Sequence, residues 1–529
     1  MALSPSSAPP WLARGAVLGA AFVLCAPLLF LAVVPGEVPE DLWAHLREVL
    51  LPRALVQTLL LLAGVGASTL VLGIGLAWLV VRHEFPGRRL FEWALALPLA
   101  FPAYVLAYVY VAGFAYSGAL ATGWRGLGLP AAWFPELRSL GGAVLVLGLA
   151  FFPYVYLMMR AMLLRQGSAA FDAARLLGAS PAGAFLRVVL PATRVAWLGG
   201  LGLVLLETLA DFGAVRLLGL TTLTTLVIQS WTALKSLALA AQLALLVLLG
   251  VMAVLALGHW LRGREGIAGP ELRAPHRQTL GPVAGALATM ACGLVVLLGV
   301  LWPIGQLLAW MPPGVLDALP WAAMRGTLAI AGLAALAAVA LGLLLSALRR
   351  RYPQDRWIAA GHFAAGLGYA VPGAVMAVAV FWCLLAIERL LGPAASGLGL
   401  STGLFALVAA LVMRFQRVGL SATGAALATL RPSLMQSAAT LGHGRLSRWW
   451  RVGLPVLRPG LLTALLLVFV EAMKELPATL MLRPFGWDTL AVGVYNATAE
   501  GLWAQAALPA LLLVFVGLVP VLLLFRGGR

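Results

Sequence analysis

The stretch LLGASPAGAFLRVVLP, residues 176–191, is matched by TLGHGRLSRWWRVGLP, residues 440–455, at an offset of 264 residues, about half the chain. In each copy a glycine is followed 13 residues later by a proline, and a leucine precedes that proline. Self-similarity at a long, fixed offset indicates an internal repeat. We therefore expect two related halves in one chain.

The composition is that of a membrane protein. The 529 residues are 62% hydrophobic and 10% charged, with a mean hydropathy of +0.99, which excludes a large water-soluble catalytic domain. A helix needs about 20 apolar residues to cross a bilayer. Runs of this length predict an all-α polytopic membrane protein with about 12 transmembrane helices. The expected spans are 15–34, 55–81, 91–116, 141–163, 195–215, 236–260, 281–309, 322–348, 357–386, 400–422, 459–481 and 503–525.

The distribution of basic residues predicts the topology. With a cytoplasmic N-terminus, 26 of the 36 Lys and Arg residues fall on the cytoplasmic side, which favours both termini inside. The net charge of +17 is scattered between apolar runs, so no nucleic-acid partner is expected. An even number of spans separates the two copies of the motif, so the six-helix repeats are parallel. We expect a first repeat over 1–261, a cytoplasmic linker over 262–280 and a second repeat over 281–529.

The repeated segments predict two compact surface loops, 171–191 and 435–455. Helix-forming stretches on either side of a glycine, closed by a proline before the next span, indicate a helix-turn-helix lying on the membrane surface. The pattern resembles the EAA loop of binding-protein-dependent ABC importer permeases. That resemblance implies the type I ABC importer permease fold and a coupling helix held by a separate ATPase subunit. It assigns ATPase coupling to Asp172, Ala173, Ala174, Gly178, Pro191, Gln436, Ser437, Ala438, Gly442 and Pro455.

The second copy departs from the family pattern. Gln436 stands where an acidic residue is expected and Ser437 replaces the first alanine, so the two halves are expected to engage their ATPases unequally. The alternative is that both segments are ordinary amphipathic loops at the membrane interface. Two copies with the same glycine-to-proline spacing favour the coupling interpretation.

Nucleotide chemistry is not expected in this chain. Its only two lysines, Lys235 and Lys474, lie outside any GxxxxGK[ST] context, so we expect a transporter permease rather than an enzyme, with no cofactor of its own. The family resemblance implies that ATP is used by partner subunits. The expected partners are two copies of an ABC ATPase, a periplasmic or lipid-anchored solute-binding protein, and the lipid of a bacterial inner (plasma) membrane.

Two longer stretches sharpen the resemblance. EWALALPLAFPAYVLAYVYVAGF (92–114) and EAMKELPATLMLRPFGWDTLAVGVY (471–495) are similar to the fused, double-length permeases of ferric-iron ABC importers. This implies that iron(III) passes from a binding protein into the cytoplasm by ATP-driven alternating access. Relatives that carry thiamine, phosphonate or other small solutes share the architecture, so another solute remains an alternative.

A secondary transporter of the major-facilitator type is the less favoured alternative. That class also has twelve spans in parallel halves, and HEFPGRR (83–89) weakly resembles its basic loop. The corresponding segment RRRYPQDR (349–356) has no second copy of that motif, and the class has no place for EAA loops.

Acidic residues recur at matching positions inside two apolar runs. Glu207 and Asp211 align with Glu471 and Glu475, and the spacing of four places each pair on one face of an expected helix. An acid in hydrocarbon costs about 2.5–3.5 kcal/mol on insertion scales, so these side chains are expected to face protein or an aqueous cavity. Lys474 lies three residues beyond Glu471.

These five residues form the predicted translocation pathway or gate, toward the periplasmic mouth. Carboxylates suit a hard cation such as Fe(III), but a permease that held the ion tightly could not release it, so no metal site is expected. The six histidines never fall at metal-ligand spacing. The alternative is purely structural: Lys474 neutralises Glu471, and the remaining acids hold helices together.

Overall fold

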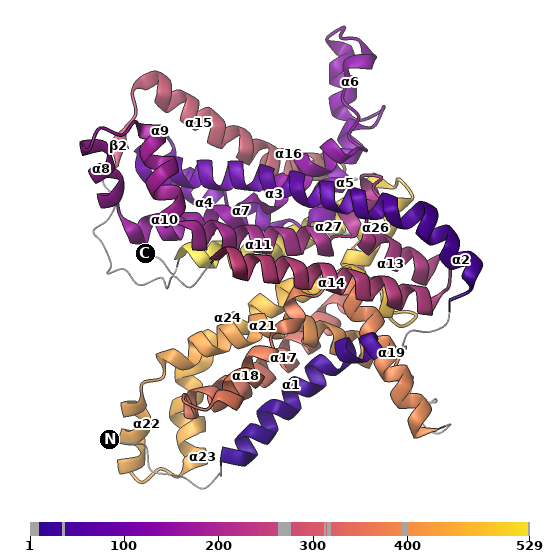
Figure 1. Ribbon diagram of the computed structural model, residues 1–529, viewed down its shortest axis with the longest axis vertical. Helices are drawn as coiled ribbons and strands as arrows, with labels where there is room; N and C mark the ends of the chain where they lie inside the picture. Colours follow the sequence, from indigo (N-terminus) through magenta and orange to yellow (C-terminus); the bar gives the residue numbers. More distant parts are fainter. Residues whose placement is uncertain are drawn as a thin grey trace. The chain divides into compact units, whose positions relative to one another are not determined.

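The computed structural model describes residues 10–33, 38–262, 277–311, 314, 319–392 and 399–526. These residues are mostly helical, and Figure 1 shows the helices. Among the described residues, eleven helices are long and apolar enough to cross a membrane, or up to twelve if the bent pair Pro181–Ala192 and Arg194–Ala210 is one span. The all-α polytopic fold with about 12 spans is confirmed.

The helices of the first half run from the N-terminus to the linker. They are α1 (Pro10–Val33), α2 (Glu40–His45), η1 (Leu46–Leu50), α3 (Leu51–Arg82), α4 (Arg88–Ala94), η2 (Leu97–Ala100), α5 (Ala103–Phe114), α6 (Ala119–Gly126), η3 (Ala131–Trp133), α7 (Leu140–Gln166), α8 (Ala169–Leu176), α9 (Pro181–Ala184), η4 (Phe185–Val189), α10 (Leu190–Ala192), α11 (Arg194–Ala210), α12 (Gly213–Leu217), α13 (Leu223–Thr232) and α14 (Leu237–Arg262).

The second half repeats much of this order of elements. Its helices are α15 (Pro282–Val296), η5 (Leu297–Leu301), α16 (Trp302–Ala309), α17 (Trp321–Arg351), α18 (Arg356–Ala364), η6 (Leu367–Ala370), α19 (Gly373–Leu391), α21 (Leu404–Thr429), α22 (Pro432–Thr440), α23 (Arg445–Arg448), η7 (Trp449–Gly453), α24 (Leu454–Lys474), α25 (Pro477–Leu482), α26 (Leu490–Ala499) and α27 (Trp503–Arg526).

The offset between matching elements is not constant along the chain, and its largest change lies between α5 and α7. It is 270 residues from η2 to η6 and from the start of α5 to the start of α19. It falls to 264 from the start of α7 to the start of α21, and α11 and α24 end with the same offset. The segment between α5 and α7 therefore absorbs the difference in length.

The described chain forms two compact units that do not coincide with the sequence halves. One unit comprises Met1–Glu37, Ser230–Leu245 and Pro320–Val492, and the other comprises the remaining segments. In the first unit α1 packs on α18 and α19, and the Arg14 guanidinium lies 2.7 Å from the Asp355 carboxylate. This hydrogen bond from Arg14 holds the pKa of Asp355 below its usual range.

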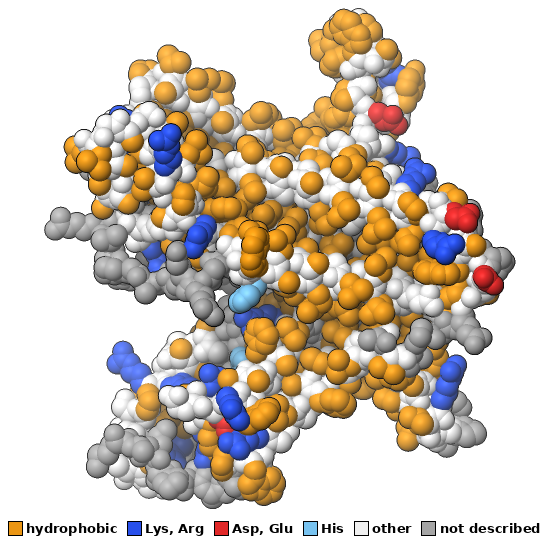
Figure 2. Space-filling view, in the orientation of Figure 1, with side chains coloured by type: hydrophobic (Ala, Val, Ile, Leu, Met, Phe, Trp, Pro, Cys, Tyr) orange, Lys and Arg blue, Asp and Glu red, His pale blue; other side chains and the backbone are white. Residues whose placement is uncertain are grey.

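In the other unit, helices from the second half cover helices of the first. α15 packs on α4, α16 on α5, and α27 on η2. The reason lies in α5, which is apolar on all sides and buried along nearly its whole length, so it needs neighbours on every face. Figure 2 shows hydrophobic side chains over most of the visible surface of both units, as expected for surfaces that contact lipid.

Several expected span limits are wrong, and prolines explain two of them. The expected spans 91–116 and 357–386 are each broken by a turn of 3-10 helix, after which α5 follows Pro102 and α19 follows Pro372. Proline cannot donate the backbone hydrogen bond that an unbroken helix requires. The expected span 195–215 ends as a helix at Ala210, and 459–481 ends at Lys474.

The predicted linker 262–280 lies largely outside the described residues, which omit 263–276. Its last part forms β2 (Gln278–Thr279), which pairs in parallel with β1 (His83–Glu84), directly after the end of α3. The Leu280 amide also donates to the carbonyl of Glu84 at 3.1 Å. The described end of the linker is therefore attached to the first half.

Candidate functional site

The first repeated loop folds as a short helix-turn-helix. α8 leads into α9 through Gly178, whose φ is +88°. The Ala179 amide donates to the carbonyl of Ala174 at 3.1 Å, which closes the helix end around a residue in the left-handed region. Glycine adopts that conformation without the steric cost that a side chain imposes. The glycine-centred turn predicted in 171–191 is confirmed.

The second repeated loop has the same backbone design. α22 leads into α23 through Gly442, whose φ is +80°. The His443 amide donates to the carbonyl of Ala438 at 3.2 Å, the counterpart of the bond accepted by Ala174. In both loops a π-helical turn follows: η7 leads directly into the long helix α24, whereas η4 leads into the short α10, and α11 begins after a bend of 72°. The glycine turn of this loop is confirmed as well.

Both loops present bare apolar side chains at their tips. Leu176 and Leu177 are each 89% exposed, and Leu441, at the position matching Leu177, is 77% exposed. Leu186 and Trp450 form a second matched pair, 57% and 65% exposed. Exposed apolar clusters of this kind mark sites of contact with a partner or a membrane.

The predicted coupling residues fall into two groups, one in each compact unit. Most of them are at the surface: Ala173, Gly178, Pro191, Gln436, Ser437, Gly442 and Pro455 are exposed, Asp172 and Ala174 are half-buried, and Ala438 is buried. Most residues of each group are therefore accessible to a partner.

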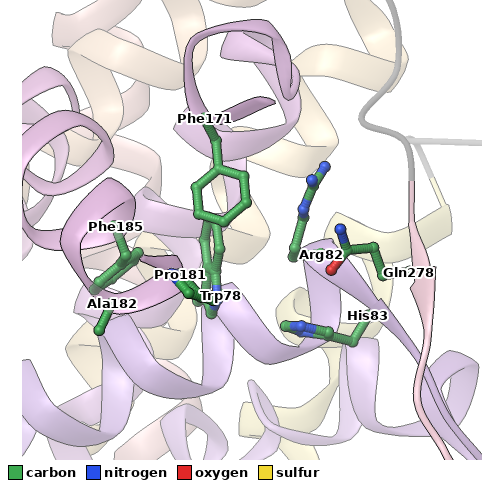
Figure 3. A pocket seen from close by; sticks show the side chains of 8 residues that line it. All are labelled: Trp78, Arg82, His83, Phe171, Pro181, Ala182, Phe185 and Gln278. Atoms are coloured by element: carbon green, nitrogen blue, oxygen red, sulfur yellow. The ribbon is translucent and has the colours of Figure 1, made fainter. Parts of the chain in front are cut away.

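The inner side of the first loop rests on the end of α3. The Trp78 ring lies 5.1 Å from the Phe171 ring and 4.8 Å from the Phe185 ring, between centroids. Arg82 and His83 line the cavity of about 240 Å³ beside these rings (Figure 3). Burial and the nearby Arg82 charge lower the pKa of His83, so that Arg82 supplies the positive charge of this cavity at neutral pH.

In the first half, the two acids of the predicted pathway are separated by the end of a helix. Glu207 is half-buried on α11, which ends at Ala210, and Asp211 has an extended ψ of 126°. The Asp211 carboxylate accepts hydrogen bonds from the amides of Ala214 (2.9 Å) and Val215 (3.2 Å). It therefore caps α12, as an acidic side chain at a helix N-terminus does.

The second half repeats this break. α24 ends at Lys474, and the Glu475 carboxylate accepts bonds from the amides of Ala478 and Thr479, each at 3.0 Å. Glu475 therefore caps α25 as Asp211 caps α12. The expectation that each acidic pair shares one helix face is wrong, because the helix ends between its two members.

An arginine distinguishes the second break from the first. Arg414, in the middle of α21, places its Nη1 atom 2.9 Å from Glu475 Oε1, and the Glu475 side chain is only 1% exposed. Gly373, at the start of α19, lies directly against this ion pair, where a Cβ atom would overlap both side chains. The position matching Arg414 in the first half is Ala150.

The remaining members of the predicted set, Glu471 and Lys474, are half-buried at the end of α24. In the part of the chain that the structure describes, no three His, Cys, Asp or Glu side chains are grouped as metal ligands would be. The residues of the set thus surround two helix breaks, one in each compact unit.

Sequence reasoning missed two functional candidates, Arg82 and Arg414. Arg414 lies inside the expected span 400–422, and an arginine within a span is a signal of function or pairing that could have been followed. Arg82 is, in the sequence, one basic residue among several at the cytoplasmic ends of the expected spans. Its contacts depend on side-chain positions in a loop 90 residues away, for which the sequence carries no signal.

The relatives of this chain include three permeases that are named for different solutes. The chain is 28% identical to the Fe(3+)-transport system permease protein FbpB 2 of Haemophilus influenzae, over 98% of this chain and 99% of that protein. It is 34% identical to the sulfate transport system permease protein CysW of Escherichia coli, over 38% of this chain and 67% of that protein. It is 28% identical to a putative 2-aminoethylphosphonate transport system permease protein, PhnV, of Salmonella typhimurium, over 40% and 75% of the two chains.

A family model matches part of the first half. The model describes the inner membrane component of binding-protein-dependent transport systems, and it covers residues 69–265, which include the loop 171–191 and both acids of the first helix break. With its many apolar helices, its two repeated loops and these relatives, the chain belongs to the family of binding-protein-dependent ABC importer permeases, as a multi-pass inner membrane protein.

Proposed function

We propose that this chain is the permease of an ABC importer that moves iron(III) from a periplasmic binding protein into the cytoplasm. Iron is favoured because the relative named for Fe(3+) transport matches along almost the whole of both chains. The relatives named for sulfate and 2-aminoethylphosphonate match only a part of this chain, which keeps such solutes as the second candidate. Family membership argues against a major-facilitator transporter.

The observation that carries the coupling role is the pair of apolar loop tips. Two loops built on the same turn each expose large apolar side chains, Leu177 and Leu441, where a monomeric protein in water would bury them. Two matched surfaces fit two copies of the same partner. We propose that the loops 171–191 and 435–455 each hold one ATPase subunit, with both termini of the chain on the same, cytoplasmic side.

The proposed pathway role now rests on the two helix breaks. The Asp211 and Glu475 carboxylates are engaged by backbone amides, so we assign them to holding the breaks. Three other members of the set lie within one turn of those breaks: Glu207, Glu471 and Lys474. We propose that these three line the path of the cation. A carboxylate that only lines the path suits a cargo that must be released.

The stoichiometry tests the proposal. The chain and its ATPase, expressed together and purified in a lipid nanodisc, should form a complex of one permease chain with two ATPases, as measured by native mass spectrometry. Substitution of Leu177 or Leu441 by Glu should remove one ATPase, because a charge would be buried in an apolar contact. A wild-type complex with one ATPase or none would refute the arrangement.

A further inference from the structure

The acidic residue of the first loop is held from within the chain. Arg82, the last residue of α3, places its Nη2 atom 2.5 Å from Asp172 Oδ1. The Arg82 side chain is 4% exposed, whereas the Asp172 side chain is 44% exposed. The same guanidinium lies 4.8 Å from the centre of the Phe171 ring, so it contacts two successive residues of α8.

Both arms of the first loop rest on the same turn of α3. Trp78 lies one turn before Arg82 and contacts Phe171 from the first arm and Phe185 from the second. In Figure 3 the Phe171 ring stands over Trp78, with the Arg82 side chain beside it. Because a guanidinium over an aromatic face adds attraction to the ion pair, the contacts reinforce one another.

The described end of the linker borders the same place. Gln278 lines the cavity beside Arg82, and β2 pairs with the residues that directly follow Arg82. The end of α3 is therefore secured on one side by a strand and on the other by the loop.

Matching contacts identify the counterpart of Arg82 in the second half. A Cβ atom on Gly73 of α3 would meet Val155, and one on Gly342 of α17 would meet Gly419, the residue matching Val155 on α21. The offset from α3 to α17 is thus 269 residues, which matches Arg82 to Arg351. The loop offset of 264 matches Asp172 to Gln436.

The second half keeps the arginine but differs around it. Arg351 is exposed and lies 5.5 Å from the Tyr352 ring, and Gln436 carries no charge. The neighbouring Arg350 donates instead to the backbone carbonyls of Leu427 and Leu430, at the end of α21. The second loop therefore has no counterpart of the negative charge of Asp172.

We propose that Arg82 is a positioning residue that latches the first loop to α3 through Asp172, which makes the first loop the stiffer of the two. The inference rests on the proposed function, since stiffness matters only if the loop transmits force from an ATPase. In that setting a latched loop moves together with α3, so a movement of the ATPase held at this loop, when that subunit binds ATP, moves the transmembrane helix directly.

Hydrogen exchange of the full-length chain in nanodiscs tests the latch without any partner or cargo. Arg82→Gln and Asp172→Asn should each make the backbone amides of 169–184 exchange about tenfold faster, and the double variant should exchange no faster than either single one. This non-additivity is expected because both changes break the same interaction. Arg351→Gln, which removes the matching charge in the second half, is the control and should leave 169–184 unchanged.

Two outcomes of this experiment would overturn the latch. They are additive effects of the two substitutions, or unchanged exchange in both single variants. Neither outcome would bear on whether the loops hold ATPases, which is measured separately by the stoichiometry of the complex.

Coupling measured on the reconstituted importer gives the functional readout. With ferric iron supplied on its binding protein, Arg82→Gln and Asp172→Asn should raise the ATP hydrolysed per ion transported about threefold or more, while both ATPases stay bound. Loss of one ATPase from Asp172→Asn but not from Arg82→Gln would show that Asp172 contacts the partner directly, and would overturn the latch. An unchanged ratio in both variants would also overturn it.

Discussion

Substitution of the glycine at the turn of each loop is an informative test, because the conformational cost of a new side chain there can be separated from its steric cost. Gly178 has a φ of +88° and Gly442 one of +80°, and no atom lies within 4 Å of the Cβ position of either. A new side chain therefore meets no clash within the chain. The cost that remains is the left-handed conformation, about 1–2 kcal/mol for an ordinary residue and less for Asn or Asp.

Three substitutions at Gly178 divide the effect into its parts. Ala carries the conformational cost, which lowers the equilibrium constant for forming the observed turn about 5–30-fold. Asn has a larger side chain than Ala but a lower conformational cost in the left-handed region. Asp has the same shape as Asn and adds a negative charge. If the tip enters an apolar groove of an ATPase, Asp should uncouple ATP hydrolysis from transport most strongly, Ala should be intermediate, and Asn should be mildest.

The assay is ATP hydrolysis and solute uptake measured together on the reconstituted importer. We expect Gly178→Asp to keep ATP hydrolysis and lose uptake, and the matched Gly442→Asp to have a smaller effect, because Gln436 already departs from the pattern of the first loop. Equal and full transport by both Asp variants would refute the assignment of these loops to coupling. Equal damage by Asn and Asp would show that size, not charge, is what the partner excludes.

Two further predictions concern residues outside the loops. Glu471→Gln should leave the amount of folded protein normal while lowering uptake. Glu475→Gln should instead lower the yield of folded protein, because it leaves the charge of the half-buried Arg414 uncompensated, and Arg414→Met should partly restore that yield. Size-exclusion yield and uptake separate these effects, and normal uptake by Glu471→Gln would exclude it from the path. Lys235 has a φ of +51° in the turn between α13 and α14, where the matching turn uses Gly501, so Lys235→Gly should stabilise the protein by about 0.5–1 kcal/mol in thermal unfolding; a lower melting temperature would contradict this.

The fold class follows from properties that the sequence carries locally. Apolar runs of span length must lie in a membrane whatever their neighbours are, and positive charges mark the side on which loops remain. The glycine of each turn could also be placed, since glycine is favoured wherever the backbone must be left-handed. For these reasons the number of spans, the repeat and the shape of the loops 171–191 and 435–455 could be predicted without a structure.

The broken helices mark the limit of that reasoning. An apolar run that continues through Glu475 looks the same whether the helix goes on or ends at Lys474. The end depends on whether the backbone amides beyond it find a carboxylate, and on whether Arg414 from another helix balances the buried charge. The sequence singled out these acids but placed each pair on one helix face, whereas the helix ends between the two members of each pair.

Two other features could not be predicted from the sequence: the packing of helices from one half against the other half, and the contacts of Arg82. In a chain this apolar, nearly every helix face can pack against another, so composition does not tell which half covers α5 or α19. The partner of Asp172 depends on the side of the loop that meets α3, which is a property of the folded backbone. Hydrophobicity and turn chemistry act between neighbours in the chain, whereas pairing and packing act between residues that only the folded chain brings together.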